Sequence, residues 1–335
     1  MKRTLLAALA LAGASGGAAE IVTLAGRAMG TKWTARFEAG AAGYDPDSLR
    51  RRIADRLEAL EQQLSIYRPA SALSRFNAST HTEWFPVPVE LARVAAEARR
   101  VAALTGGAFD PTVFPLVRLW GFGPEGRTGT VPPPAEILVA RERIGWSLLE
   151  VRVAPPALRR AQAGITADFS STAKGFAADA VGTLLDQAGL PRHVVQVGGD
   201  VRVGAAPEGQ PGWAIAIEEP VEERGGVACI VALADSAVST SGDYRNFFRA
   251  GGQRYGHIID PRSGLPPQGD LASATVIHHS SATASSLATG LFVLGPEAGW
   301  RLALEERLAA LFIVRRGSEL EQVSTPEFDR WRKAH

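Results

Sequence analysis

Apolar residues recur every three or four positions between residues 45 and 64, which is the period of a helix with one buried face. Asp45-Pro46-Asp47 precedes this run and is typical of a helix start. A second helix is predicted from about Pro88 to Leu104, and Gly106-Gly107 ends it. Upstream, the alternation of apolar and polar residues across Ile21 to Phe37 predicts a strand or a pair of strands.

The second half of the chain is richer in short β-prone runs. The predicted strands are His193–Val197, Trp213–Ile217, Val227–Leu233, Tyr255–Ile259, Ala274–His278 and Ala309–Val314. The predicted helices are Ala173–Ala188, Ala282–Leu294 and Pro296–Leu308. Most strands follow one another without a helix between them, which favours antiparallel sheets flanked by helices, hence an α+β fold forming a single catalytic unit. The Pro- and Gly-rich stretch from Gly121 to Pro134 is expected to be a loop, either a lid or an insertion.

The first 19 residues have the features of a secretion signal. Lys2 and Arg3 precede an apolar stretch from Leu5 to Leu11, and the small residues Gly17-Ala18-Ala19 form a cleavage site before Glu20. The apolar stretch is too short to span a bilayer, and the residue directly after the predicted cleavage site is Glu20 rather than the cysteine that a lipid anchor would need. We therefore expect residues 20–335 to form one exported domain without a membrane anchor.

The charge balance and the cysteine content exclude some classes of function and of covalent structure. Lysine and arginine total 36 and aspartate and glutamate 35, so loss of the signal would leave a net charge of about −1. A near-neutral balance argues against nucleic-acid binding, which needs a basic surface. Cys229 is the only cysteine, so an internal disulfide is impossible, and its apolar surroundings predict a buried, inert thiol.

The densest polar motif runs from Asp168 to Asp179. Small hydroxyl residues stand before the expected helix, and Lys174 falls in its first turn. Free backbone N–H groups, the helix dipole and an ammonium group together favour phosphate binding. The segment is no Walker A loop, because the wrapping glycines are missing. A helix cap with a solvated lysine is the alternative that this stretch alone leaves open.

Five further stretches could line a binding site. Aromatic and turn residues at Ser65–Pro69, Gly107–Thr112 and Trp120–Gly123 could stack a flat ring, or could serve turns and core packing. Ser239–Asn246 and His257–Gly264 place His257 beside a Pro/Gly turn, where a strand end can present polar groups.

The spacing of two pairs of residues predicts whether their side chains face the same side of their helix or strand. Ser285 and Thr289 are four residues apart and therefore share one helical face. His278 and His279 are adjacent on a predicted strand, so we expect them to face opposite sides and not to chelate a metal together.

In this order, the motifs resemble the FAD:protein FMN transferase (ApbE) family. The matching stretches are Met29-Gly30-Thr31, Tyr67–Asn77, Gly107–Thr112, Asp168–Asp179, Val197-Gly198-Gly199-Asp200, Ser239–Tyr244, His257–Gly264 and Ala282–Gly295. The resemblance implies a T-fold-like α+β architecture acting in the periplasm. It also implies a Mg²⁺-dependent enzyme that splits FAD, esterifies FMN to a threonine of a partner flavoprotein and releases AMP.

The resemblance also assigns residues. It implies FAD contacts at Met29, Tyr67, Ala108, Phe109, Asp110, Asp168, Lys174 and Ile259. Magnesium would be held by the carbonyl of Ser171 and by the side chains of Ser285 and Thr289. His257 is our hypothesised base or substrate-orienting residue, and Lys174 would balance phosphate charge.

At position 285 the chain departs from the family, which typically has aspartate there as a metal ligand. Ser285 offers only a neutral hydroxyl, and Ala288 offers no replacement carboxylate. A periplasmic FAD-binding protein without transferase activity is therefore the alternative hypothesis.

Two other readings are weaker. Ser171-Thr172-Ala173-Lys174, Tyr244-Arg245-Asn246 and Arg262-Ser263-Gly264 have the spacing of penicillin-recognising serine hydrolases, but the large helical domain expected between the first two motifs is not predicted. Asp270–Thr275 is similar to a flavin acceptor signature but is one residue short, and it is better interpreted as a strand.

Overall fold

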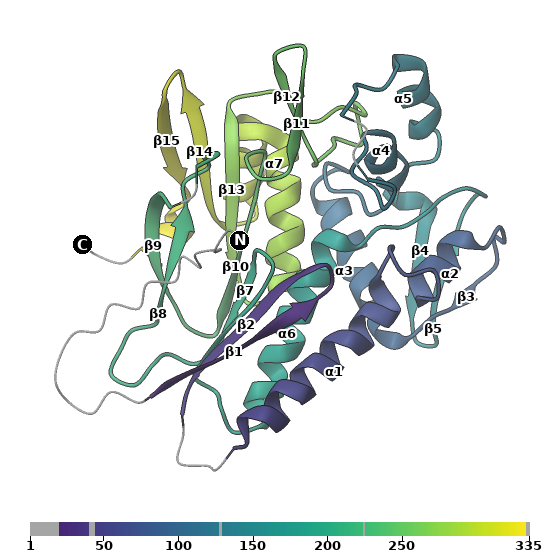
Figure 1. Ribbon diagram of the computed structural model, residues 1–335. Coiled ribbons are helices and arrows are strands. Elements are labelled where there is room, and N and C mark those ends of the chain that lie inside the picture. The colour runs from purple at the N-terminus through teal and green to yellow at the C-terminus, as the bar shows by residue number, and fades with distance from the viewer. Residues whose placement is uncertain (1–19, 40–43, 127–128, 224, 333–335) are drawn as a thin grey trace.

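The computed structural model describes residues 20–39, 44–126, 129–223 and 225–332, so the predicted signal at 1–19 lies outside the described residues. Its centre is one sheet with the strand order β1-β2-β6-β7-β10-β13-β14-β15 (Figure 1). Every neighbouring pair in this sheet is antiparallel. The strands are β1 Ile21–Ala28, β2 Thr31–Glu38, β6 His193–Val197, β7 Asp200–Val203, β10 Ser236–Gly242, β13 Leu271–His278, β14 Ala309–Arg316 and β15 Glu319–Ser324. The predicted α+β class is confirmed.

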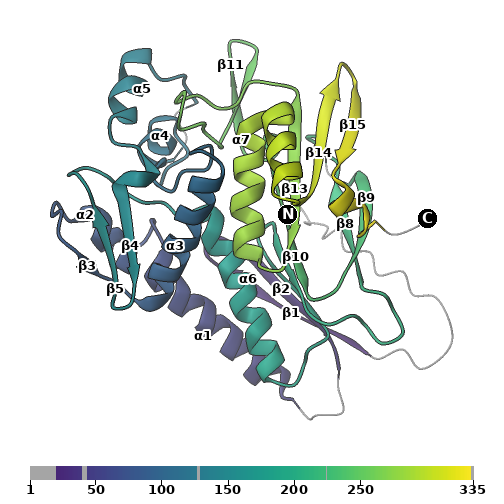
Figure 2. The ribbon, with the colours of Figure 1, turned by 180° about the vertical axis from the view of Figure 1, so that it is seen from behind.

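Helices cover one face of this sheet (Figure 2). They are α1 Pro46–Leu64, α3 Val89–Leu104, α6 Ser170–Gln187 and α7 Ser281–Glu305. Helices α1, α6 and α7 pack on the strands, and α3 packs on α6 and α7. The buried residues of α1 are the apolar positions of the predicted pattern, and Asp45 caps its first turn by accepting from the backbone N–H groups of Asp47 and Ser48.

Helices α6 and α7 approach closely at Gly175. A Cβ atom built there would lie 2.3 Å from the carbonyl oxygen of Ser281, so only glycine fits. Two helices were predicted on either side of residue 295, and this is confirmed: α7 consists of two helical segments that meet at Gly295, which adopts a non-helical conformation with φ 81° ahead of Pro296.

The other face of the sheet is covered by the hairpin β8 Trp213–Glu218 and β9 Val227–Leu233, with the short helix α8 Pro326–Asp329. Apolar side chains of β7, β10, β13 and β14 meet those of β8, β9 and α8 in a second core cluster. Cys229 is half-buried in β9, and burial raises the pKa of its thiol.

Several short elements were not predicted. They include α2 Ala72–Ala78, the sheet of β3 Phe85–Pro86, β5 Pro156–Arg160 and β4 Leu149–Val153, the 3-10 turn Trp146–Leu148, α4 Phe114–Leu119, α5 Pro134–Arg141, and β11 Phe247–Ala250, the hairpin partner of β12 Gln253–Gly256. Most are too short to show a period in the sequence. Helices α4 and α5 pack with Trp120, Phe248 and Tyr255 into a third apolar cluster beside the sheet.

Two sequence expectations were wrong. The strand predicted for Tyr255–Ile259 ends at Gly256, so residues 257–259 lie in a loop. His278 and His279 do not face opposite sides, because β13 ends at His278, and their rings are 3.9 Å apart between centroids.

Among the described helices, none has both the length and the apolar character needed to cross a membrane.

Candidate active site

A cavity of about 930 Å³ opens between the start of α6, the first half of α7, the ends of β7 and β10, and the hairpin of β8. Its volume is at the upper end of the range for ligand sites. Every residue assigned to the site from the sequence lines this cavity: Met29, Tyr67, Ala108, Phe109, Asp110, Asp168, Ser171, Lys174, His257, Ile259, Ser285 and Thr289. Folding therefore brings the separate motifs to one place.

The motif predicted to bind phosphate, Asp168–Asp179, contains the start of α6. The backbone N–H of Ser170 donates to Oδ1 of Asp168 at 2.8 Å, and the N–H of Asp168 donates to the carbonyl of Pro111 at 2.7 Å. The helix begins at Ser170, so Ser170 and Ser171 lie inside its first turn and do not precede it, and Lys174 comes one position later than that turn. The reason is that the Asp168 carboxylate, rather than a serine or threonine hydroxyl, accepts the N–H of the first helical residue, Ser170.

Lys174 lies along the cavity wall. Its Nζ donates to the carbonyl of Ser170 at 2.6 Å. A Cβ atom at Gly198, where φ is +63°, would lie 3.2 Å from Cδ of Lys174, so glycine at this turn leaves space for the lysine stem. Lys174 thus meets a carbonyl rather than the hydroxyl of Ser171, unlike the serine–lysine pair expected of a penicillin-recognising hydrolase.

Four hydroxyl groups gather where α6, α7 and β10 meet. Oγ of Ser171 and Oγ1 of Thr289 are 2.8 Å apart, and Oγ of Ser241 is 3.0 Å from the same Thr289 atom. Ser285 donates from Oγ to the carbonyl of Ser171 at 2.6 Å. Thr289 also contacts the carbonyl of Ser285 at 3.1 Å. Ser241 joins this cluster from the motif at 239–246, which was predicted to line a binding site, although no role had been assigned to Ser241 itself.

This oxygen cluster suits a hard cation. Hydroxyl and carbonyl oxygens are ligands that Mg²⁺ accepts, although it usually also takes one or two carboxylates and substrate phosphates. Among the described residues there is no group of three or more His, Cys, Asp or Glu side chains that could hold a metal. A cation here would therefore depend on neutral protein oxygens, on the substrate and on any carboxylate close by.

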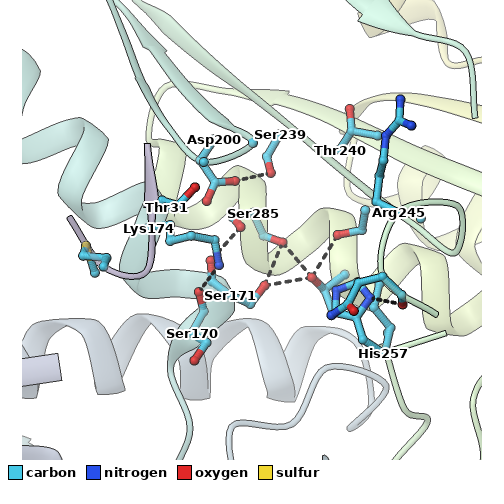
Figure 3. Close-up of a pocket in the computed structure, with 18 of the residues that line it drawn as sticks. Thr31, Ser170, Ser171, Lys174, Asp200, Ser239, Thr240, Arg245, His257 and Ser285 are labelled. Carbon is cyan, nitrogen blue, oxygen red and sulfur yellow. Dashed lines mark hydrogen bonds between the residues drawn. The ribbon is translucent and has the colours of Figure 1, made fainter. Parts of the chain in front are cut away.

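Asp200, the first residue of β7, is that carboxylate. Its side chain is 3% exposed, and one oxygen accepts from Oγ of Ser239 at 2.5 Å. Figure 3 shows Asp200, Lys174 and Ser285 around the same part of the cavity. Asp200 belongs to a motif of the family, but no function had been predicted for it; the signal available was a carboxylate directly after Gly198-Gly199.

His257 lies on the other side of the hydroxyl cluster from Lys174 (Figure 3). Nδ1 of His257 is 3.2 Å from the carbonyl oxygen of Asn246, and a carbonyl can only accept, so this nitrogen carries the hydrogen in the neutral ring. Nε2 then has the lone pair. The ring edge of His257 faces the Phe122 ring, with 6.3 Å between centroids.

Two predicted flavin contacts differ in how they can act. Asp110 is buried, and its oxygens accept from the N–H and hydroxyl of Thr112 and from the N–H of Trp146. Burial raises the pKa of Asp110, and these hydrogen bonds oppose the rise. Asp110 therefore shapes the loop that presents Phe109. Tyr67, by contrast, is 61% exposed at the rim, where its ring can stack on a flat ligand.

One charged pair lines the cavity. Arg245 forms an ion pair with Glu218 at the end of β8. A second ion pair, between Arg254 of β12 and Glu222 in the loop between β8 and β9, connects these two small hairpins.

Solved flavin transferases have the same fold. The chain is similar to the flavin transferase ApbE from Vibrio cholerae, with a TM-score of 0.86 and 37% identity over 93% of this chain and 99% of that one. It is equally similar to the apo form of flavinyl transferase ApbE from Pseudomonas stutzeri, with a TM-score of 0.85 and 38% identity over 95% and 98% of the two chains.

The family model described as ApbE family matches residues 29–312, and the chain belongs to this family. Relatives named FAD:protein FMN transferase include one from Vibrio cholerae, 39% identical over 92% of this chain and 92% of its own length. Another, from Escherichia coli strain K12, is 36% identical over 93% of this chain and 89% of its own length. The predicted resemblance is confirmed.

Proposed function

We propose that this protein is a FAD:protein FMN transferase that cleaves FAD, joins FMN through a phosphoester to a threonine of a partner flavoprotein and releases AMP. The observation that carries the proposal is the convergence of all the motif residues on one cavity in a chain of the ApbE family. The relatives are named as transferases, so a store of FAD without transfer activity finds no support among them.

The part of the cavity that is lined by Lys174 and the start of α6 is suited to the diphosphate of FAD. Lys174 supplies a positive charge, and the backbone N–H groups of Ser171 and Thr172 in the first turn of α6 have no carbonyl partner within the helix. Tyr67 at the rim and Phe109 in the wall offer ring surfaces to the flat parts of the substrate.

Mg²⁺ would be held by the carbonyl of Ser171, Oγ of Ser285 and Oγ1 of Thr289. Oγ of Ser285 is 2.6 Å from the carbonyl oxygen of Ser171, and Oγ1 of Thr289 is 2.8 Å from Oγ of the same Ser171, which supports a single compact oxygen site. Bound there, the cation would offset negative charge on the phosphates during transfer.

The transfer step is an in-line displacement at phosphorus. The threonine oxygen attacks the FMN-side phosphorus, a new P–O ester bond forms, and the bond to the bridging oxygen breaks, so AMP leaves with that oxygen. We assign His257 to accept the threonine proton on Nε2, because its Nδ1 is engaged with Asn246. Lys174 stabilises the charge that develops on the leaving phosphate.

We also propose that the protein is exported and works in the periplasm on exported acceptor proteins. The support is the signal-like sequence at residues 1–19.

The test is incubation of the purified protein with FAD, MgCl₂ and an acceptor domain carrying a threonine flavinylation motif. A fluorescent flavin band should appear on the acceptor in a denaturing gel, and AMP should be released in equal amount. An acceptor with alanine in place of the threonine and a reaction with EDTA are the controls. Normal FAD binding with no acceptor labelling under any condition would overturn the transferase assignment.

A further inference from the structure

The proton of Ser285 is in the wrong place for a cation site. Its hydroxyl donates to the carbonyl of Ser171, and both oxygens are assigned to the metal in the proposed function. A hydroxyl that binds a cation must turn its hydrogen away from it, and a carbonyl that accepts this hydrogen offers less electron density to a metal. Cation binding therefore requires another acceptor for the Ser285 proton.

Asp200 has an oxygen available for that purpose. Its Oδ2 is buried and has no hydrogen-bond partner among the described residues, while the other carboxylate oxygen is taken by Ser239. An unpartnered buried carboxylate oxygen is costly to the fold, so its presence at the wall of the cavity calls for a ligand-related reason.

Asp200 lies in the same part of the cavity as Lys174, Ser239 and Ser285 (Figure 3). Burial raises the pKa of the Asp200 carboxyl, and the charge of Lys174 and the hydroxyls of Ser239 and Ser285 act against that rise. The Ser285 hydroxyl donates to Ser171, and because both side chains line this part of the cavity it can turn towards Asp200 instead.

We propose that Asp200 supplies the negative charge of the metal site through Ser285, by accepting the Ser285 hydrogen at Oδ2 so that the Ser285 oxygen faces the cation. Asp200 is then a positioning residue, and the pair Asp200–Ser285 replaces the single aspartate typical of the family at position 285. The inference rests on the proposed metal-dependent function.

The competing explanation is structural, since Asp200 follows the Gly198-Gly199 turn and could merely hold β7 to β10 through Ser239. The two explanations predict different effects of removing the Asp200 charge on FAD binding without metal and on cation binding. A carboxylate beside a diphosphate repels it, so removing the charge should leave metal-free FAD binding unchanged or tighter, while weakening cation binding. A loosened structure would weaken both.

The experiment measures Mn²⁺ as the probe cation, by loss of its free electron paramagnetic resonance signal on titration with FAD-loaded protein, with a titration of FAD alone subtracted. The variants are D200N, S285D and D200N/S285D. D243N is the charge-matched control, because Asp243 is paired with Arg315 and lies outside the cavity lining. FAD affinity without metal is measured on every variant by calorimetry.

D200N should weaken Mn²⁺ binding about 10- to 100-fold, the range found for residues that orient metal ligands. In the S285D variant, adding D200N should weaken Mn²⁺ binding by less than about 3-fold, because aspartate at 285 binds the cation directly. D243N should bind Mn²⁺ within about 2-fold of the unaltered protein.

Equal losses from D200N in both backgrounds, or no loss in the first, would overturn the role of Asp200 while leaving the transferase proposal intact. Absence of Mn²⁺ binding by the unaltered FAD-loaded protein would overturn the metal site itself and this inference with it.

Discussion

The backbone N–H of Ser281 donates to Oδ1 of Asp179 at 2.9 Å, so a carboxylate of α6 caps the start of α7. The other oxygen of Asp179 accepts from the hydroxyl of Ser280 and the N–H of Ala282. Helix α6 contributes Lys174 to the cavity and α7 contributes Ser285, so this cap fixes the two walls relative to each other.

Replacing Asp179 with alanine should therefore destabilise the protein. The N–H groups of Ser281 and Ala282 would lose their acceptor in a buried place, which costs about 1–3 kcal/mol. Urea unfolding measures the change, and Asp179→Asn, which keeps one oxygen, should lose less. Equal stability of the alanine variant and the unaltered protein would contradict the capping role.

Replacing Lys174 with methionine should weaken FAD binding by about 10- to 100-fold, because a charge-assisted contact to a phosphate contributes about 1.5–3 kcal/mol. Calorimetry with FAD gives the affinity, and Lys174→Arg should recover part of it. An unchanged affinity in the methionine variant would place the diphosphate elsewhere.

Replacing His257 with glutamine should slow FMN transfer by about 10²- to 10⁴-fold and leave FAD affinity within a few-fold. Glutamine can still donate to the Asn246 carbonyl, so the loop keeps its anchor while the base is lost. Single-turnover labelling of the acceptor measures the rate. If the glutamine variant transfers FMN at the original rate, His257 only positions the substrate.

Replacing Gly175 with alanine should destabilise the fold by about 1–3 kcal/mol or more, because the new methyl group would meet the Ser281 carbonyl at 2.3 Å and push α6 from α7. Gly269→Ala is the matched control, since a Cβ there has nothing within 4 Å. Denaturant titration of both variants should separate them, and equal midpoints would show that the helices can move apart at no cost.

Stability should fall in mild acid because of His278. Burial, and secondarily His279, lowers the pKa of His278 from 6.5 to about 4. The unfolded chain then binds the proton more readily than the folded one, so stability present above pH 6.5 is lost as the pH falls towards 4. The loss is on the order of 2 kcal/mol after allowance for partial exposure.

Urea unfolding between pH 7 and pH 4.5 tests this, with His278→Gln expected to flatten the slope. His81, which is exposed, provides the control variant His81→Gln, which should keep the slope. A slope unaffected by the His278 change would assign the acid sensitivity to other groups.

The sequence predicted long periodic elements well and short ones poorly. The helix of Leu49, Ile53 and Leu57 has a clear apolar face, and its observed bounds follow the cap at Asp45. The strand predicted to reach Ile259 fails because Ile259 is buried against α4 and α5 rather than in the sheet, which an apolar run cannot distinguish.

The members of the site were predicted through the family motifs, but their mutual geometry was not. The Asp168 motif and the loop of Pro111 are far apart in sequence and meet through one backbone hydrogen bond. The stacking of His278 on His279 likewise depends on where β13 ends. Such relations are tertiary, so no local pattern encodes them.

The residues that line the cavity come from sequence positions between Met29, in the first hairpin, and Thr289, in α7, and include the start of α6. A molecule held there clamps together segments from almost the whole length of the domain, and the unfolded chain offers it no comparable site. By mass action, FAD at a hundred times its Kd would add about 2.7 kcal/mol to the stability of the folded state. The melting temperature of the protein should thus report directly how much of it is occupied.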